Sequence, residues 1–105
     1  MKTSELTDAA LDWSVTKCQF IAGTANSLIS SEVKPYSTNW AQGGLIIERE
    51  GIQIKKHASN WIALPADAEF SEEAYQEGDT PLIAAMRCYV ASKLGDEVEL
   101  PEEVL

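Results

Sequence analysis

The stretch "TPLIAAMRCYVASKLG", residues 80–95, decides the fold because it predicts a helix with both ends marked. Thr80 is a favourable N-cap, Pro81 suits the first helical position, and Gly95 suits the residue after the last turn. Only two side chains in the stretch are charged. A helix with so little polar surface is normally covered on more than one side, so we expect it at the centre of the molecule.

The two sides of this helix differ in side-chain size. One broad face carries large apolar residues: Leu82, Ile83, Met86, Tyr89, Val90 and Leu94. The opposite face carries small residues: Ala84, Ala85, Cys88, Ala91 and Ser92. We expect the large face to lie on a sheet and the small face to admit a second helix, which would bury Ala84 and Cys88. If no helix covered the small face, its exposure would indicate a homodimer through this helix.

The second helix is predicted over Asp8–Lys17, with Thr7 as its cap. A narrow apolar stripe follows the 3.6-residue period: Leu11, Val15 and Cys18. Trp13 lies nearly opposite that stripe, and we expect a neighbouring segment to cover it. We interpret "CQFIAG", residues 18–23, as a short buried strand, and residues 27–37 as a loop.

The stretch "STNWAQGGLIIEREGI", residues 37–52, predicts a short helix that ends at Gly51 in the left-handed conformation. We interpret Gly43 and Gly44 as a flexible turn that precedes this helix. They do not predict a phosphate loop, because Leu-Ile-Ile follows them where such a loop needs Lys and then Ser or Thr. The dinucleotide-binding glycine pattern is missing as well, and we expect no cofactor.

The Glu-Arg-Glu run within that stretch does not predict a catalytic carboxylate pair. Glu48 and Glu50 are two residues apart, so on a helix their side chains point about 200° away from each other. Arg49 stands between them and is expected to form local ion pairs of small energetic value.

An antiparallel hairpin is predicted over residues 52–64. Apolar and polar residues alternate from Ile52 onward, a turn follows around residues 58–60, and an apolar run then ends before Pro65. We therefore expect an α+β fold in which two main helices pack on a small antiparallel sheet that includes this hairpin.

Two acidic segments complete the chain, which we expect to form a single domain over residues 1–105. Residues 65–79 predict a solvated acidic loop with at most one turn of helix after Ser71. Residues 96–105 predict an acidic tail, with Val98, Leu100 and Val104 available to pin it to the body.

The overall charge disfavours nucleic acids and anionic membranes as binding partners. The chain has 17 acidic and 8 basic residues and a formal net charge of −9. Direct nucleic-acid binding is disfavoured, because phosphate neutralisation by Lys and Arg supplies most non-specific affinity, and an anionic membrane surface is disfavoured for the same reason. The sequence shows neither a membrane span nor a signal peptide, so we expect the cytoplasm, with Cys18 and Cys88 as reduced core thiols.

The sequence predicts no metal site and no catalytic residues. His57 is the only histidine, and zinc would find no second nitrogen or sulfur ligand near it. The acids of residues 65–79 lack the spacing of an EF-hand calcium loop.

Three blocks of this sequence resemble the NinX-type family of small proteins from lambdoid phages and prophages of enteric bacteria, a domain of unknown function. The blocks are "KTSELTDAALDW", "STNWAQGGLIIEREGI" and "TPLIAAMRCYVASKLGDEVELPEE", about half of the chain. Family members often have Asp at position 39 and Pro at position 45, where this chain has Asn39 and Leu45. The resemblance implies a phage or prophage origin and the cytoplasm of a bacterial host, and it transfers no catalytic residue.

These features favour a non-enzymatic accessory protein that binds a host or phage protein. The candidate contact residues are Trp13, Trp40, Trp61, Glu48, Arg49 and Glu50. An alternative is an acidic DNA mimic that occludes a nucleic-acid-binding protein, although its carboxylates would have to be spaced along one face. A further alternative is a small enzyme with an unrecognised site that uses His57 and the two glutamates of the 37–52 stretch.

Overall fold

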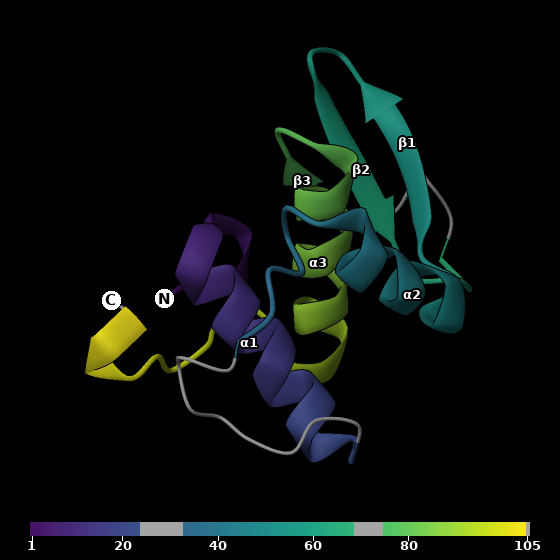
Figure 1. Cartoon of the computed structure of the whole chain (residues 1–105). Coiled ribbons are helices and arrows are strands. Elements are labelled where there is room, and N and C mark those ends of the chain that lie inside the picture. The colour runs from purple at the N-terminus through teal and green to yellow at the C-terminus, as the bar shows by residue number, and fades with distance from the viewer. Residues whose placement is uncertain (24–32, 69–74, 105) are drawn as a thin grey trace.

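The structure is a computed structural model that describes residues 1–23, 33–68 and 75–104 (Figure 1). Its elements are the 3-10 helix η1 (Thr3–Glu5), helices α1 (Asp8–Ile21) and α2 (Trp40–Glu50), strands β1 (Gln53–His57), β2 (Asn60–Leu64) and β3 (Gln76–Gly78), helix α3 (Pro81–Leu94) and the 3-10 helix η3 (Glu102–Val104). The three strands form one antiparallel sheet in the order β1-β2-β3. The expected α+β fold is confirmed.

Helix α3 has the expected ends and the expected central position. The Thr80 hydroxyl oxygen accepts a hydrogen bond from the Ile83 amide at 3.1 Å, and Gly95 follows the helix with a φ of 85°. The helix contacts the sheet on one side and α1 on another, and α2 also packs against it (Figure 1). All other principal elements therefore meet at α3.

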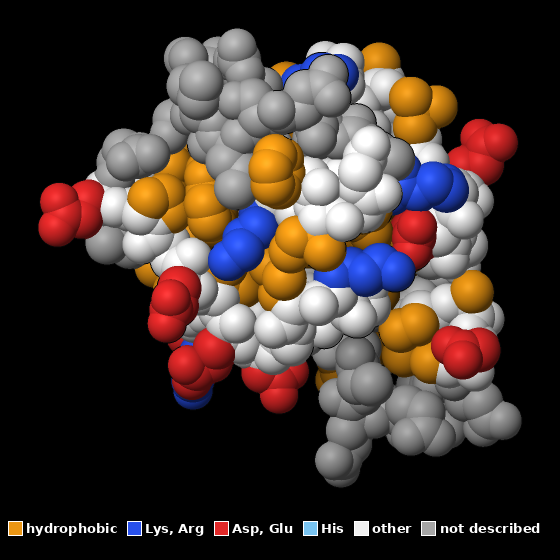
Figure 2. All heavy atoms as spheres, turned by 90° about the horizontal axis from the view of Figure 1, so that it is seen from below, with side chains coloured by type: hydrophobic (Ala, Val, Ile, Leu, Met, Phe, Trp, Pro, Cys, Tyr) orange, Lys and Arg blue, Asp and Glu red, His pale blue; other side chains and the backbone are white. Residues whose placement is uncertain are grey.

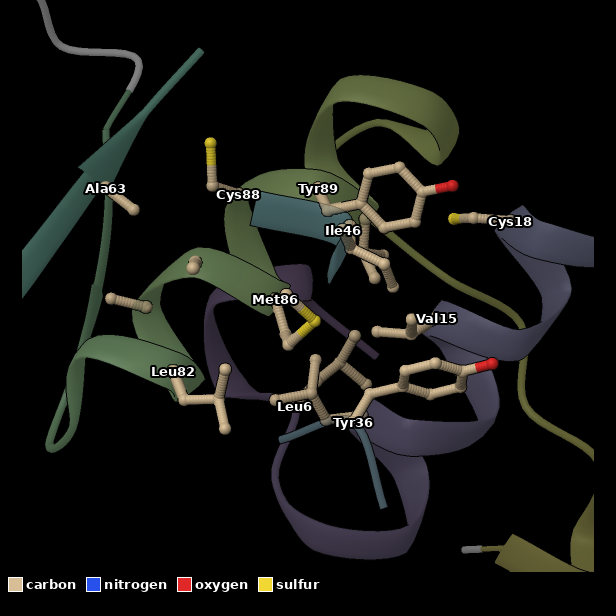
Figure 3. Packing of buried hydrophobic residues seen from close by; sticks show 14 of the residues in the cluster. Leu6, Val15, Cys18, Tyr36, Ile46, Ala63, Leu82, Met86, Cys88 and Tyr89 are labelled. Atoms are coloured by element: carbon tan, nitrogen blue, oxygen red, sulfur yellow. The ribbon is translucent and has the colours of Figure 1, made fainter. Parts of the chain in front are cut away.

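The two faces of α3 are oriented opposite to our prediction. A Cβ atom added to Gly78 of β3 would lie 2.6 Å from the backbone nitrogen of Ala84, so the small face approaches the sheet closely. Cys88 leaves the helix on the side of the strand that carries Ala63, whereas Met86 points toward Val15 of α1 (Figure 3). Leu82, Met86 and Tyr89 of the large face therefore fill the space among the three helices, whereas Ile83 lies beside Gly78 of β3.

The reason for this orientation lies in the third strand, which the sequence prediction lacked. Gly78 in that strand lets the helix backbone come close at Ala84, with the side chain of Ile83 beside the same glycine, and the small side chains of Ala84 and Cys88 fit the short distance to the sheet. The predicted packing of the two helices and the predicted burial are confirmed, since Ala84 is 0% and Cys88 3% exposed. Because this face is covered within the chain, the argument for a homodimer through it does not apply.

Helix α1 is longer than predicted and includes residues 18–21, which we had interpreted as part of a short strand. Thr7 does occupy the N-cap position, although its side chain makes no capping hydrogen bond. Continuation of the helix buries Cys18 and Gln19 against neighbouring elements. Tertiary contacts thus override the local preference of Phe20 and Ile21 for strand.

Helix α2 begins at Trp40, so the prediction that Gly43 and Gly44 form a turn before it is wrong. Asn39 caps the helix by accepting a hydrogen bond from the Ala41 amide at 2.8 Å. A Cβ atom on Gly43 would clash with the carbonyl oxygen of Tyr36 and lie 2.6 Å from Leu82 Cδ1. This glycine therefore permits close packing of α2 on α3.

The predicted C-terminal end of the short helix and the predicted hairpin are confirmed, with the hairpin strands covering Gln53–His57 and Asn60–Leu64. Gly51 terminates α2 with φ 67° and ψ 31°, in the left-handed region. The hairpin joins β1 and β2 through a two-residue turn, with His57 opposite Asn60 and Gln53 opposite Leu64.

The acidic segment 65–79 is more structured than the solvated loop we predicted. Its residues 76–78 form β3, and Gln53 Nε2 donates to the carbonyl oxygens of Pro65 at 2.8 Å and Ala68 at 2.7 Å. The turn of helix expected after Ser71 lies outside the described residues, as does most of the loop expected over residues 27–37.

The C-terminal segment is pinned as expected, and it pairs with the N-terminal segment. Val98 is 3% exposed, and its backbone nitrogen donates to the Met1 carbonyl oxygen at 2.9 Å. An isolated bridge joins Lys2 to Glu97, and the Thr3 hydroxyl donates to the Gly95 carbonyl oxygen at 2.6 Å. Among the described residues, no helix is long and apolar enough to cross a membrane.

Candidate functional site

The outer side of α2 exposes apolar side chains that no other described element covers. Trp40 is 56% exposed and Leu45 is 66% exposed, and Ala41 lies exposed between them. The Trp40 ring rests on the helix, since a Cβ atom on Gly44 would be 3.6 Å from Trp40 Cε3. We call Trp40, Ala41 and Leu45 the α2 outer face.

Two of the three candidate tryptophans contribute to the core instead. Trp13 is only 7% exposed, with Lys17 Nζ 5.6 Å from its ring centroid, so its expected cover is confirmed. A partner could reach Trp13 only if part of the core opened, so this side chain does not belong to the candidate site. Trp61 of β2 is partly buried and packs against the core, with Lys56 Nζ 5.0 Å from its ring centroid.

Arg49 joins three helices, which sequence reasoning missed. Its Nη2 donates to Gln19 Oε1 of α1 at 2.7 Å and to Tyr89 Oη of α3 at 3.1 Å. The Tyr89 hydroxyl donates in turn to the same Gln19 oxygen at 2.7 Å. Burial raises the pKa of Tyr89 to about 12, so the hydroxyl keeps its proton in this network. No short-range pattern in the sequence predicts that Arg49 binds Gln19 and Tyr89.

The predicted ion pair of Arg49 exists, and Glu50 has a second cation beside it. Arg49 Nε lies 3.0 Å from Glu50 Oε2, and Lys93 Nζ from the end of α3 lies 3.2 Å from Glu50 Oε1. The hydrogen bond from Arg49 is the main cause that lowers the pKa of Glu50. Figure 2 shows this end of the molecule, where Lys and Arg side chains lie among apolar ones.

The three residues considered for catalysis, Glu48, Glu50 and His57, do not lie together in the structure. Glu50 is committed to two cations, whereas Glu48 is exposed on the other side of α2. His57 ends β1 at the tip of the hairpin, away from the last turn of α2 (Figure 1). The described residues hold no group of three or more His, Cys, Asp or Glu side chains that could bind a metal ion.

The two cysteines lie in the core, as expected, and are not activated for chemistry. Both are free and buried, and Figure 3 shows them on different sides of α3. Burial raises the pKa of Cys18 to about 12 and that of Cys88 to about 11. The thiolate is the reactive form, so both groups are inert at neutral pH.

Leu45 is the main residue of the outer face that the sequence interpretation missed. The apolar run Leu45–Ile47 covers about 200° of a helix surface, so its members cannot all face the core. Ile46 is 1% exposed and faces the core, which leaves Leu45 outside.

Comparison with known proteins yields one family. The sequence model of the family described as "Bacteriophage P22, NinX" matches residues 2–93. No curated protein matches the chain.

Proposed function

We propose that this chain, which belongs to the NinX family of bacteriophage P22, is a phage accessory protein. It acts by binding another protein inside the bacterial host. The observation that carries the proposal is the exposure of Trp40 and Leu45 on one side of α2. Tryptophan is one of the residue types enriched at the positions where protein interfaces gain most of their affinity.

The energetics of these side chains support an interface. Burial of a leucine side chain stabilises an assembly by roughly 1.5–3 kcal/mol, and a tryptophan buries still more surface. The face stands on a helix fixed at both ends by Asn39 and Gly51. A helix held at both ends loses little conformational entropy on binding, so the ordering cost that offsets this gain is small.

The charge of the chain restricts the chemistry of the partner. Glu48 is exposed beside the outer face, and the chain has a formal net charge of −9. We expect the partner to offer an apolar pocket bordered by Lys or Arg side chains, because such complementarity speeds association and excludes acidic competitors. Such a partner is a protein of the phage or of its host.

Affinity purification from infected bacteria tests this proposal. The tagged wild-type chain is compared with Trp40→Ser/Leu45→Ser and with the control Ile21→Ser, which removes an equally exposed side chain (66%) from α1. We expect the wild-type chain and the control to recover the same protein in stoichiometric amount, and the double variant to lose it. Repeated recovery of no partner, or equal recovery by all three, would refute the proposal.

A further inference from the structure

The two edges of the sheet differ in how their backbone groups are used. At the β3 edge, the carbonyl oxygen of Glu77 accepts a hydrogen bond from Arg87 Nη1 at 2.6 Å. Arg87 Nε also donates to the Leu6 carbonyl oxygen at 2.8 Å, which holds the guanidinium in place. One side chain of α3 thus already binds the outward carbonyl oxygen of the β3 edge, which a further strand would need.

The β1 edge has outward-pointing backbone groups. Residues that flank a two-residue hairpin turn form a hydrogen-bonded pair, and such pairs alternate along an antiparallel ladder. The pair His57–Asn60 therefore directs the N–H and C=O groups of Ile54 and Lys56 away from β2. Neither residue forms a backbone hydrogen bond outside the hairpin with any other described residue.

The same register predicts which backbone groups point outward at the β3 edge, and this supports the outward direction given for Ile54 and Lys56. Trp61 and Ala63 of β2 point toward β3, where they pair with Gly78 and Gln76. The groups of Glu77 must then point outward, and its carbonyl oxygen is the one that Arg87 binds. The alternation thus holds across all three strands.

The charge of β1 indicates what could pair with it. The strand carries Lys55 and Lys56 in a chain whose formal net charge is −9. A second copy of β1 would place like charges opposite one another, which is unfavourable, and lysine on an edge strand commonly prevents such self-pairing. An acidic strand would instead bring a carboxylate close to the ammonium group of Lys56.

We propose that β1 binds an acidic, extended segment of a partner protein, which would add to the sheet as a fourth strand at Ile54 and Lys56. The hairpin projects beyond the end of α3, so its tip stands apart from the helices (Figure 1). Main-chain hydrogen bonds would supply affinity and Lys56 would select for acidic residues. This surface is separate from the α2 outer face, and either can bind without the other.

A synthetic peptide tests the proposal directly. The probe is the fluorescently labelled, end-capped peptide Glu-Val-Glu-Val-Glu-Val-Glu, and the control peptide has Lys in place of every Glu. Fluorescence anisotropy should show binding of the acidic peptide and none of the basic one. No binding of the acidic peptide up to millimolar concentration, or equal binding of both peptides, would overturn the proposal.

A pair of variants separates the backbone contribution from the charge. Lys56→Ala removes the ammonium and keeps the outward N–H, whereas Lys56→Pro removes both, and proline is tolerated on an edge strand. We expect Lys56→Pro to weaken peptide binding about 3- to 10-fold more than Lys56→Ala, the effect of one lost hydrogen bond. Equal affinities of the two variants would contradict strand addition.

Amide hydrogen exchange on the wild-type chain gives an answer even if Lys56→Pro fails to fold. Saturation with the acidic peptide should slow exchange of the Ile54 and Lys56 amides by at least about 10-fold. Unchanged exchange at both amides in the saturated complex would overturn the proposal. Trp40→Ser/Leu45→Ser should bind the peptide as the wild type does, so failure of the α2 surface and failure of the β1 edge give different results.

Discussion

Helices α3 and α2 are both rich in apolar residues, but they use them differently. Half of the α3 residues are buried, and they lie on both the sheet side and the helix side. In α2 only Gly43 and Ile46 are buried, and the helix exposes a tryptophan and a leucine on its outer side. The comparison separates apolar residues that specify the fold from apolar residues that remain available for binding.

The glycines of the two contacts show how closely α3 is enclosed. Gly78 brings the sheet onto one side of α3, and Gly43 brings α2 onto another. Neither glycine is explained by backbone conformation, since neither has a positive φ. Sequence positions in contact with α3 should therefore be sensitive to added atoms, and positions on the α2 outer face should not.

The largest expected effect comes from a charge placed at the sheet contact of α3. Ala84→Glu would bury an unpaired carboxylate at a residue with 0% exposure, and we expect it to lower the free energy of unfolding by about 3 kcal/mol or more. Urea unfolding followed by circular dichroism measures the loss.

Ala41→Glu is the matched control, because Ala41 lies exposed near the N-terminus of α2. A glutamate there faces water and the positive end of the helix dipole, so we expect a change within about 0.5 kcal/mol. Similar losses for the two alanines would contradict the contrast between the helices.

Adjacent glycines of α2 provide the second test. Gly43→Ala adds a methyl group against the Tyr36 carbonyl oxygen and Leu82, and overpacking of this kind costs about 1–3 kcal/mol. Gly44→Ala adds it at ordinary contact distance from Trp40, and we expect stabilisation by about 0.5–1 kcal/mol from helix propensity. Thermal unfolding of both variants should show melting-temperature changes of opposite sign. If both move in the same direction, α2 does not pack on α3 through Gly43.

These glycines also show which parts of the fold could be predicted from the sequence. The ends of α3, the left-handed end of α2 at Gly51 and the hairpin follow from local signals, because a cap or a turn acts within a few residues. The start of α2 could not be placed in this way. Gly43 favours a turn by its own propensity, and only its contact with Leu82, far along the chain, gives the reason for a glycine inside a helix.

The third strand and the Arg49 network were not predictable for the same reason. Strand β3 has three residues, Gln76–Gly78, within an acidic segment, and it forms because β2 offers it an edge. Gln19 and Arg49 lie on different helices, 30 residues apart in the sequence, and no local pattern relates them. Because the sequence prediction did not include β3, it offered no strand that could approach the small face of α3 closely. The predicted orientation of the two faces was therefore wrong.

The pH dependence of stability tests whether the core around α3 is closed to water, and it needs no substitution. The buried thiols have pKa values raised to about 12 for Cys18 and about 11 for Cys88, from 9.0. A raised pKa contributes stability below the unfolded pKa that is lost as pH rises, because the unfolded chain ionises first. We expect the free energy of unfolding to fall between pH 8.5 and 10, by about 1 kcal/mol per thiol at pH 10.

The double variant Cys18→Ala/Cys88→Ala serves as the control for that measurement. It should be less stable at pH 8 because of lost packing, but its stability should fall less steeply up to pH 10. Tyr89 has a pKa raised to about 12 from 10.0 and would begin to contribute only at the upper end of this range. An identical pH dependence with and without the thiols would show that they are not enclosed.

The smallest expected effect on stability belongs to the α2 outer face. Trp40 and Leu45 already contact water over more than half of their surface, at 56% and 66% exposed, so little burial is lost when they are replaced. Trp40→Ser and Leu45→Ser should each change the free energy of unfolding by no more than about 0.5 kcal/mol. The same substitutions should abolish recovery of the partner, since the apolar contact would be removed from the centre of the interface. A large loss of stability in Trp40→Ser would mean that the ring on Gly44 supports α2 itself. Both helices would then use their apolar residues to stabilise the fold, α2 to a smaller extent than α3. Loss of the partner in that variant would reflect unfolding.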